Sequence, residues 1–265
     1  MSGRNDLTVN YYNEWDKKTA AWLRELIKAG LIPKGEVDER SITDVQPGDL
    51  RGFTQCHFFA GIGGWSYALQ LAGWPESEPV WTGSCPCQPF SLGGAQAGTD
   101  DTRHLWPTFF RLIRKCRPRA VFGEQVKAAV QFGWLDEVFT NLEEEDYACG
   151  ACVLGAHSVG IDQIRQRIYW GCHSNSNRLR LERFRNAAPK PWSREQFEGL
   201  VQASLRVSIP TGRGGGLSDG LPSRMVQLCG YGNAIVPQVA AEFIGAYLDT
   251  LEDFTRNNET VFERI

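Results

Sequence analysis

The sequence FAGIGGW at residues 59–65 constrains the fold more than any other feature of the chain. It follows a short apolar run that predicts a buried strand, and it opens a helical pattern that stops at Gly73. Glycines in such a turn let the backbone approach a ligand closely, and the helix start offers free N–H donors. The turn therefore predicts either a plain strand–helix connection or a site for a dinucleotide or an adenosine-bearing methyl donor.

The same alternation of strand and helix continues along the 265 residues, which suffice for one large domain, with or without a small appendage. Short apolar runs predict strands at residues 7–12, 37–42, 55–59, 80–83, 120–122, 148–154 and 168–171. Helical periodicity predicts helices at residues 16–31, 65–71, 105–115, 134–144 and 236–251. Strands that alternate with helices predict a parallel α/β sheet.

Charge is distributed unevenly. The formal net charge is −3, but residues 173–224 hold nine Lys and Arg against four Asp and Glu. A basic segment on an acidic body is typical of a localised contact with a polyanion, although a solvated charged loop explains it equally well. Eight cysteines without a secretory signal predict a reducing, cytoplasmic setting, and their spacing lacks the paired pattern of a zinc site. No apolar stretch approaches the ~20 residues that span a bilayer.

Cys87 lies in TGSCPCQPFS, residues 82–91, just beyond a predicted strand. A cysteine between prolines at a strand end is poorly placed for core packing and suits a thiolate aimed at a ligand. A plain loop cysteine is the alternative.

Two further motifs carry charge at strand ends. Glu124 follows the predicted strand 120–122, where a carboxylate lies in the ligand crevice of a parallel sheet or else begins a helix. Gln163, Arg165 and Arg167 recur at period two, which puts them on one side of an extended segment. Arginine suits forked hydrogen bonding to phosphate or base edges, and a surface edge strand is the alternative. Asn233, in the turn GYGNAIVP, either caps the last helix or contacts a ligand.

Together these motifs resemble those of the DNA cytosine-5 methyltransferases. The resemblance is carried by FAGIGGW, PCQPFS, EQV, QIRQR and GNAIVP, and it covers residues 11–251 apart from 173–224. It implies an α/β, Rossmann-like, S-adenosylmethionine-dependent methyltransferase sheet formed by residues 1–172 and 225–265. Residues 173–224 would form a short, irregular, basic target-recognition segment.

The resemblance also implies residue roles. Cys87 would attack C6 of a cytosine flipped out of duplex DNA, Glu124 would donate to N3, and Arg165 and Arg167 would hold the ring. The implied cofactor-binding residues are Phe59, Ala60, Gly61, Ile62, Gly63, Gly64, Glu14, Trp15, Ser41, Ile42, Pro86, Leu105, Asn233 and Ile235. The implied DNA contacts are Gln88, Ser91, Arg103, Gln163, Arg178, Arg180 and Arg213. No metal is implied.

Three departures from the family pattern are visible. Only 22 residues separate Gly64 from Cys87, which leaves no room for the ribose and adenine segments usually found there. Residues 12–16 (YNEWD) and 40–45 (RSITDV) resemble those segments and precede the glycine turn, so we expect a permuted order with Glu14 beside Gly61. Ser41 replaces an acidic residue, and Gln125 replaces the usual Asn, with activity expected to be retained.

The short basic segment suggests a short or relaxed DNA target. The interpretation is a monomeric, cytoplasmic DNA methyltransferase, either phage-borne or apart from any restriction nuclease. Methylation of tRNA cytosine, a DNA-binding pseudoenzyme and, more distantly, a nicotinamide dehydrogenase are the alternatives.

Overall fold

The computed structural model describes residues 9–86, 105–161, 165–175 and 234–262, with side chains up to residue 250. The strands are β1 (Asn10–Asn13), β2 (Gly35–Asp38), β3 (Gln55–Phe58), β4 (Val80–Gly83), β5 (Ala120–Val126), β6 (Tyr147–Gly155) and β7 (Gln166–Ser174). The helices are α1 (Lys17–Lys28), α2 (Gly64–Leu71), α3 (Trp106–Cys116), α4 (Trp134–Glu144) and α7 (Pro237–Phe262). Short 3₁₀ turns are η1 (Pro47–Leu50), η4 (Lys127–Phe132) and η5 (Ala156–Val159).

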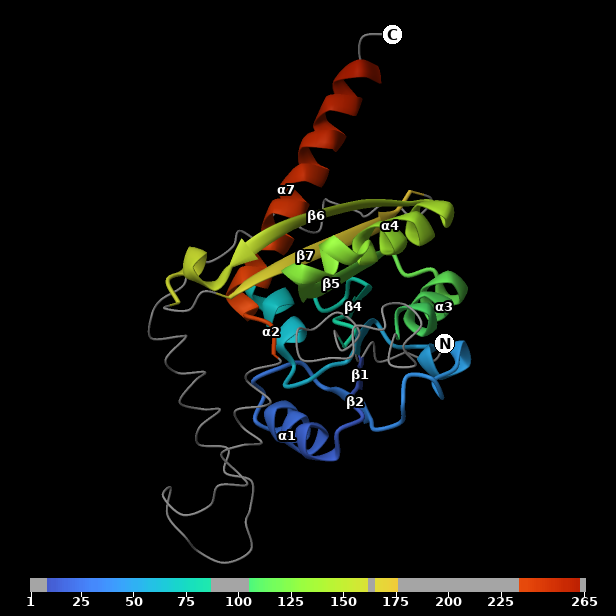
Figure 1. Ribbon diagram of the computed structural model, residues 1–265, viewed down its shortest axis with the longest axis vertical. Coiled ribbons are helices and arrows are strands. Elements are labelled where there is room, and N and C mark those ends of the chain that lie inside the picture. The colour runs from blue at the N-terminus through green and yellow to red at the C-terminus, as the bar shows by residue number, and fades with distance from the viewer. Residues whose placement is uncertain (1–8, 87–104, 162–164, 176–233, 263–265) are drawn as a thin grey trace, which may run out of the picture.

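The seven strands form one sheet in the order β2-β1-β3-β4-β5-β7-β6 (Figure 1). The first five are parallel, whereas β7 runs antiparallel to both β5 and β6. The expected parallel sheet is therefore wrong for β7. A parallel connection needs a crossover of a dozen or more residues, usually a helix, and β6 and β7 are joined only by η5 and a short loop. The α/β fold class agrees with the sequence prediction, although the sheet is mixed and not wholly parallel.

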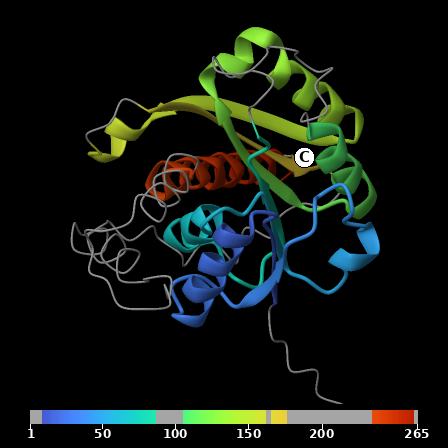
Figure 2. The same ribbon diagram turned by 60° about the horizontal axis from the view of Figure 1, so that its bottom comes forward.

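Helices cover both faces of this sheet (Figure 2). Strand side chains alternate between faces, so Phe122 packs with α2 and α7 while Val121 packs with α3 and α4. Helix α1 covers the first face beside Tyr12 of β1. Both faces of the central strands are therefore buried. The carboxyl ends of the parallel strands are where a ligand site is expected in such a sheet.

Several element bounds differ from the sequence prediction. β4 and α4 have the predicted bounds, whereas β5 continues four residues further and includes Glu124. The extension exists because β7 pairs with β5 as far as Val126, well past the parallel ladder with β4, which ends at Phe122. Helix α7 runs beyond the predicted end at residue 251, and its last part projects past the sheet (Figure 1). Within the described ranges, no helix combines the length and apolar character that a membrane span requires.

Candidate active site

The glycine turn lies at the carboxyl end of β3, next to the end of β1. Gly61 and Gly63 have φ values of +56° and +77°, a backbone conformation that residues with a side chain rarely adopt. Phe59, just before them, also has a positive φ of +53°. Among the residues that the structure describes, a Cβ added to Gly61 would meet only the Phe59 carbonyl oxygen, 4.0 Å away. The turn is therefore open on the side where a ligand would approach.

Glu14 joins the N-terminal segment to this turn. One carboxylate oxygen accepts from the Gly61 N–H at 2.8 Å, and the other accepts from the Asp16 N–H at 2.9 Å. The Ala60 N–H also donates to the Asn13 carbonyl at 2.9 Å. These contacts confirm the prediction that Glu14 lies beside Gly61. Burial raises the pKa of Glu14, and the two amide hydrogen bonds oppose this shift.

Residue 15 is a large exposed aromatic between two anchored acids. The Trp15 side chain is 75% exposed, while Asp16 caps α1 by accepting from the Thr19 N–H at 2.8 Å. An exposed indole next to a carboxylate and an open glycine turn presents a flat apolar surface beside hydrogen-bond acceptors.

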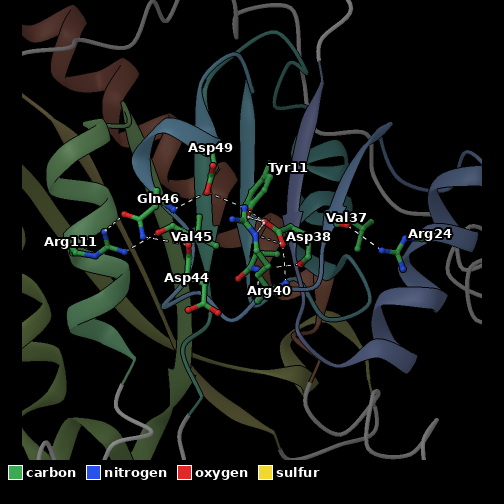
Figure 3. Close-up of polar contacts among 11 residues, drawn as sticks. Tyr11, Arg24, Val37, Asp38, Arg40, Asp44, Val45, Gln46, Asp49 and Arg111 are labelled. Atoms are coloured by element: carbon green, nitrogen blue, oxygen red, sulfur yellow. Dashed lines mark hydrogen bonds and ion pairs between the residues drawn. The ribbon is translucent and has the colours of Figure 1, made fainter.

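The segment at residues 38–46 is fixed from both sides (Figure 3). Arg40 pairs with Asp38 at 2.7 Å and with Asp49 at 3.0 Å, and Asn13 donates to the Arg40 carbonyl at 2.9 Å. On the other side, Arg111 of α3 donates to the Val45 carbonyl at 2.9 Å. No local sequence pattern predicts this clamp, because it depends on how β1, β2 and α3 meet.

Ser41 and Ile42 occupy the middle of the clamped segment. The Ser41 hydroxyl accepts from the Thr43 N–H at 3.3 Å and bonds with the Thr43 hydroxyl at 2.8 Å. Ile42 is 3% exposed and belongs to the core under α3. The predicted adenine segment therefore has an ordered backbone with a hydroxyl where a carboxylate would be expected.

The segment leading to Cys87 is held at two successive residues. Trp65 Nε1 donates to the Ser84 hydroxyl at 2.9 Å, and Gln125 Nε2 donates to the Cys85 carbonyl at 3.3 Å. Cys85 is buried, and burial raises the pKa of its thiol strongly, so this cysteine stays protonated. Pro86 is exposed. Cys87 itself lies outside the described residues.

Glu124 and Arg167 form a buried ion pair on neighbouring strands. Arg167 Nε lies 2.9 Å from Glu124 Oε1, and the Glu124 side chain is 9% exposed. Burial raises the pKa of Glu124 to about 6, although Arg167 and Arg165 lower it. A carboxyl with this pKa can carry a proton near neutral pH.

Arg165 lies on the same side of the segment but makes a different contact. Its Nη2 donates to the Ala234 carbonyl at 2.9 Å, in the turn before α7. Ile235, next in that turn, is 8% exposed and packs on Gly64, where an added Cβ would lie 2.8 Å from Ile235 Cγ1. Leu105 is partly buried at the start of α3.

The structure thus brings together the residues predicted from the glycine turn, the N-terminal segment, β5 and β7. Two residues that were not among the predicted site residues also contribute: Trp65 anchors Ser84, and Tyr169 pairs with Glu124 across the β5–β7 ladder. Trp65 lies inside FAGIGGW and Tyr169 two residues after Arg167, so both periodicity and position could have identified them. The predicted residues outside the described part of the chain are Cys87, Gln88, Ser91, Arg103, Gln163, Arg178, Arg180, Arg213 and Asn233.

Comparison with known proteins identifies a family model and several relatives. The model described as C-5 cytosine-specific DNA methylase matches residues 75–208. Type II methyltransferase M.HhaI of Haemophilus parahaemolyticus is 31% identical over 193 residues, 58% of this chain and 58% of that protein. M.HpaII of Haemophilus parainfluenzae is 28% identical over 160 residues, 44% of this chain and 45% of that protein. The chain thus spans about half the length of these relatives.

Solved structures give weaker likenesses. A putative DNA modification methyltransferase encoded within a prophage of E. coli has a TM-score of 0.41 at 18% identity, over 70% of this chain and 52% of that one. Spodoptera frugiperda DNMT2 has a TM-score of 0.40 at 14% identity, over 63% and 50%.

Proposed function

Because the chain belongs to the C-5 cytosine-specific DNA methylase family, we propose that it transfers a methyl group from S-adenosylmethionine to C5 of a cytosine in duplex DNA. The observation that carries this proposal is the Glu124–Arg167 ion pair, with Glu124 next to Gln125, which anchors the segment leading to Cys87 at Cys85 while Trp65 anchors it at Ser84. Cytosine C5 is a poor nucleophile, so its activation requires a thiolate at C6 and a proton donor at N3. Glu124, with a pKa of about 6, has the protonation behaviour that the second role demands.

The described residues fit S-adenosylmethionine. Gly61 has open space in place of a side chain, Glu14 keeps acceptor capacity for ribose hydroxyls, and Trp15 offers an exposed face for a base. When bound, S-adenosylmethionine supplies an electrophilic methyl group. Residues 59–64, Glu14, Trp15, Ser41 and Ile42 would hold it, with Pro86, Leu105, Asn233 and Ile235 completing the pocket.

In this proposal the chain's own groups act in sequence. The Cys87 thiolate adds to C6, and its electron pair makes C5 enamine-like while Glu124 donates a proton to N3. Arg167 keeps Glu124 in place and offers its guanidinium to the ring oxygen O2. After C5 has been alkylated, loss of the C5 proton, departure of Cys87 as the thiolate and return of the N3 proton to Glu124 restore the neutral aromatic ring.

We extend the proposal to chain order and partners. The strand order β2-β1-β3-β4-β5-β7-β6 and the Glu14–Gly61 contact support a permuted chain in which the cofactor strands β1 and β2 come first. The base would be flipped out of the duplex, with residues 173–224 and the arginines Arg103, Arg178, Arg180 and Arg213 contacting DNA. A monomer in the cytoplasm is the proposed form.

The test uses duplex DNA, tRNA and a labelled methyl donor with the wild-type protein. Label in DNA alone is expected, whereas label in tRNA alone would replace the proposed substrate. A covalent adduct with 5-fluorocytosine DNA, absent in Cys87→Ser, is expected as well, and an adduct formed equally by Cys87→Ser would refute the role of Cys87. Bisulfite sequencing of DNA from expressing cells then reads the target sequence.

A further inference from the structure

The two arginines of the QIRQR motif divide their contacts between two parts of the site. Arg167 Nε faces Glu124, whereas Arg165 Nη2 donates to the Ala234 carbonyl 69 residues further along the chain. The sequence assigns both arginines to the target cytosine through its family resemblance, and their spacing of two residues places them on one side of an extended segment. Their partners in the structure separate them.

The turn that Arg165 contacts is packed against the glycine turn. Ile235 fills the space beside Gly64, the first residue of α2, so closely that even a methyl group there would collide with it. Tyr169 of β7 belongs to the same apolar cluster as Ile235, and Val236 packs against that cluster. The turn at residues 234–236 is thus held between β7 on one side and the start of α2 on the other.

The Arg165 contact is maintained against an electrostatic cost. The Arg165 guanidinium is partly buried beside Arg167, and both burial and this like charge lower the pKa of Arg165. A hydrogen bond from a charged donor to a backbone carbonyl is the kind of contact that offsets such a cost.

We propose that Arg165 is a positioning residue that sets the turn at residues 234–236 against the glycine turn, rather than a group that touches the base. The inference rests on the proposed function, since it concerns the same S-adenosylmethionine pocket. It predicts that the two arginines affect different steps: Arg165 governs cofactor affinity, and Arg167 governs turnover.

Calorimetric binding of S-adenosylhomocysteine to the full chain tests this directly, without catalysis. Arg165→Met keeps the stem and removes the donors, and we expect it to weaken binding about tenfold, as for the loss of one charged hydrogen bond. The KM for the methyl donor should rise by a similar factor with little change in kcat, and Arg165→Lys should restore part of the affinity. Arg167→Met should bind like the wild type and lose turnover.

The outcomes separate the inference from the function on which it depends. A folded Arg165→Met variant that binds normally but loses kcat would overturn the inference and return Arg165 to the base. If Arg165→Met does not fold, Ile235→Ala replaces it, because trimming the residue on Gly64 should weaken binding in the same way, and unchanged affinity would again overturn the inference. A wild-type protein that binds no S-adenosylhomocysteine would overturn the proposed function itself.

Discussion

Gln125 is the most informative single position to perturb, because it links β5 to the segment that leads to Cys87. Its side chain is 2% exposed, donates to the Cys85 carbonyl at 3.3 Å and accepts from the Val126 N–H at 2.9 Å. Gln125→Asn shortens the reach by one carbon–carbon bond, about 1.5 Å. The bond to Val126 survives, but the distance to the Cys85 carbonyl exceeds hydrogen-bonding range unless the segment moves.

The cost follows from what is lost. One buried methylene contributes about 1 kcal/mol and the hydrogen bond to Cys85 about another 1 kcal/mol, so unfolding should be easier by about 2 kcal/mol. For a domain of this size, that lowers the melting temperature by roughly 4–8 °C. Because Cys87 is two residues beyond Cys85, a shift of about 1 Å in the segment should also reduce kcat by up to about 100-fold.

Thermal unfolding and methyl transfer to duplex DNA measure both effects on one protein preparation. Gln125→Glu is the matched control, since it keeps the length and the acceptor for Val126 but lacks the donor for Cys85. It should lose kcat without opening a cavity. An Asn variant as stable and as active as the wild type would refute the reasoning, and an inactive wild type beside an active Asn variant would refute the expectation that Gln125 supports activity.

Three further perturbations follow from buried groups. Burial lowers the pKa of His57 to about 3, below its usual 6.5. Neutral His57 therefore contributes to stability above pH 6.5, and this contribution is lost as the pH falls through 3. The free energy of unfolding of His57→Gln, measured in urea, should depend less on pH across this range than that of the wild type, and an equal dependence would contradict this. The pKa of Glu124 is raised from 4.5 to about 6, so its contribution is present below pH 4.5 and lost as the pH rises through 6; Glu124→Gln should therefore gain stability relative to the wild type above pH 6, as urea unfolding would report. A Cβ in Gly123→Ala would collide with the buried Trp170 indole, so the free energy of unfolding of this variant should fall by about 3 kcal/mol. Gly150→Ala places its Cβ where no described residue lies within 4 Å, so its free energy of unfolding should fall by less than about 1 kcal/mol; thermal unfolding measures both.

The boundaries of helices and strands could be predicted from the sequence where local residues end the pattern. β4 and α4 begin and end as predicted, because an apolar run or a helical period is closed there by glycine or by a charge cluster. β5 was predicted too short, since its last four residues are ordered by pairing with β7 rather than by their own propensity. The anchors Trp65–Ser84 and Gln125–Cys85 join residues 19 and 40 positions apart, and no local pattern encodes such distances.

The Glu14–Gly61 contact was predictable across 47 residues because it depends on sheet register and not on chain order. β1 lies between β2 and β3, all parallel, and Asn13 pairs with Phe58 at the carboxyl ends. The next residues on each strand therefore leave the sheet side by side, which brings the Glu14 carboxylate to the glycine turn whichever strand comes first in the sequence. Residues that lie within this register could be inferred from motifs. The partner of Arg165 could not, because the packing of Ile235 and α7 on α2 is what brings Ala234 beside Arg165.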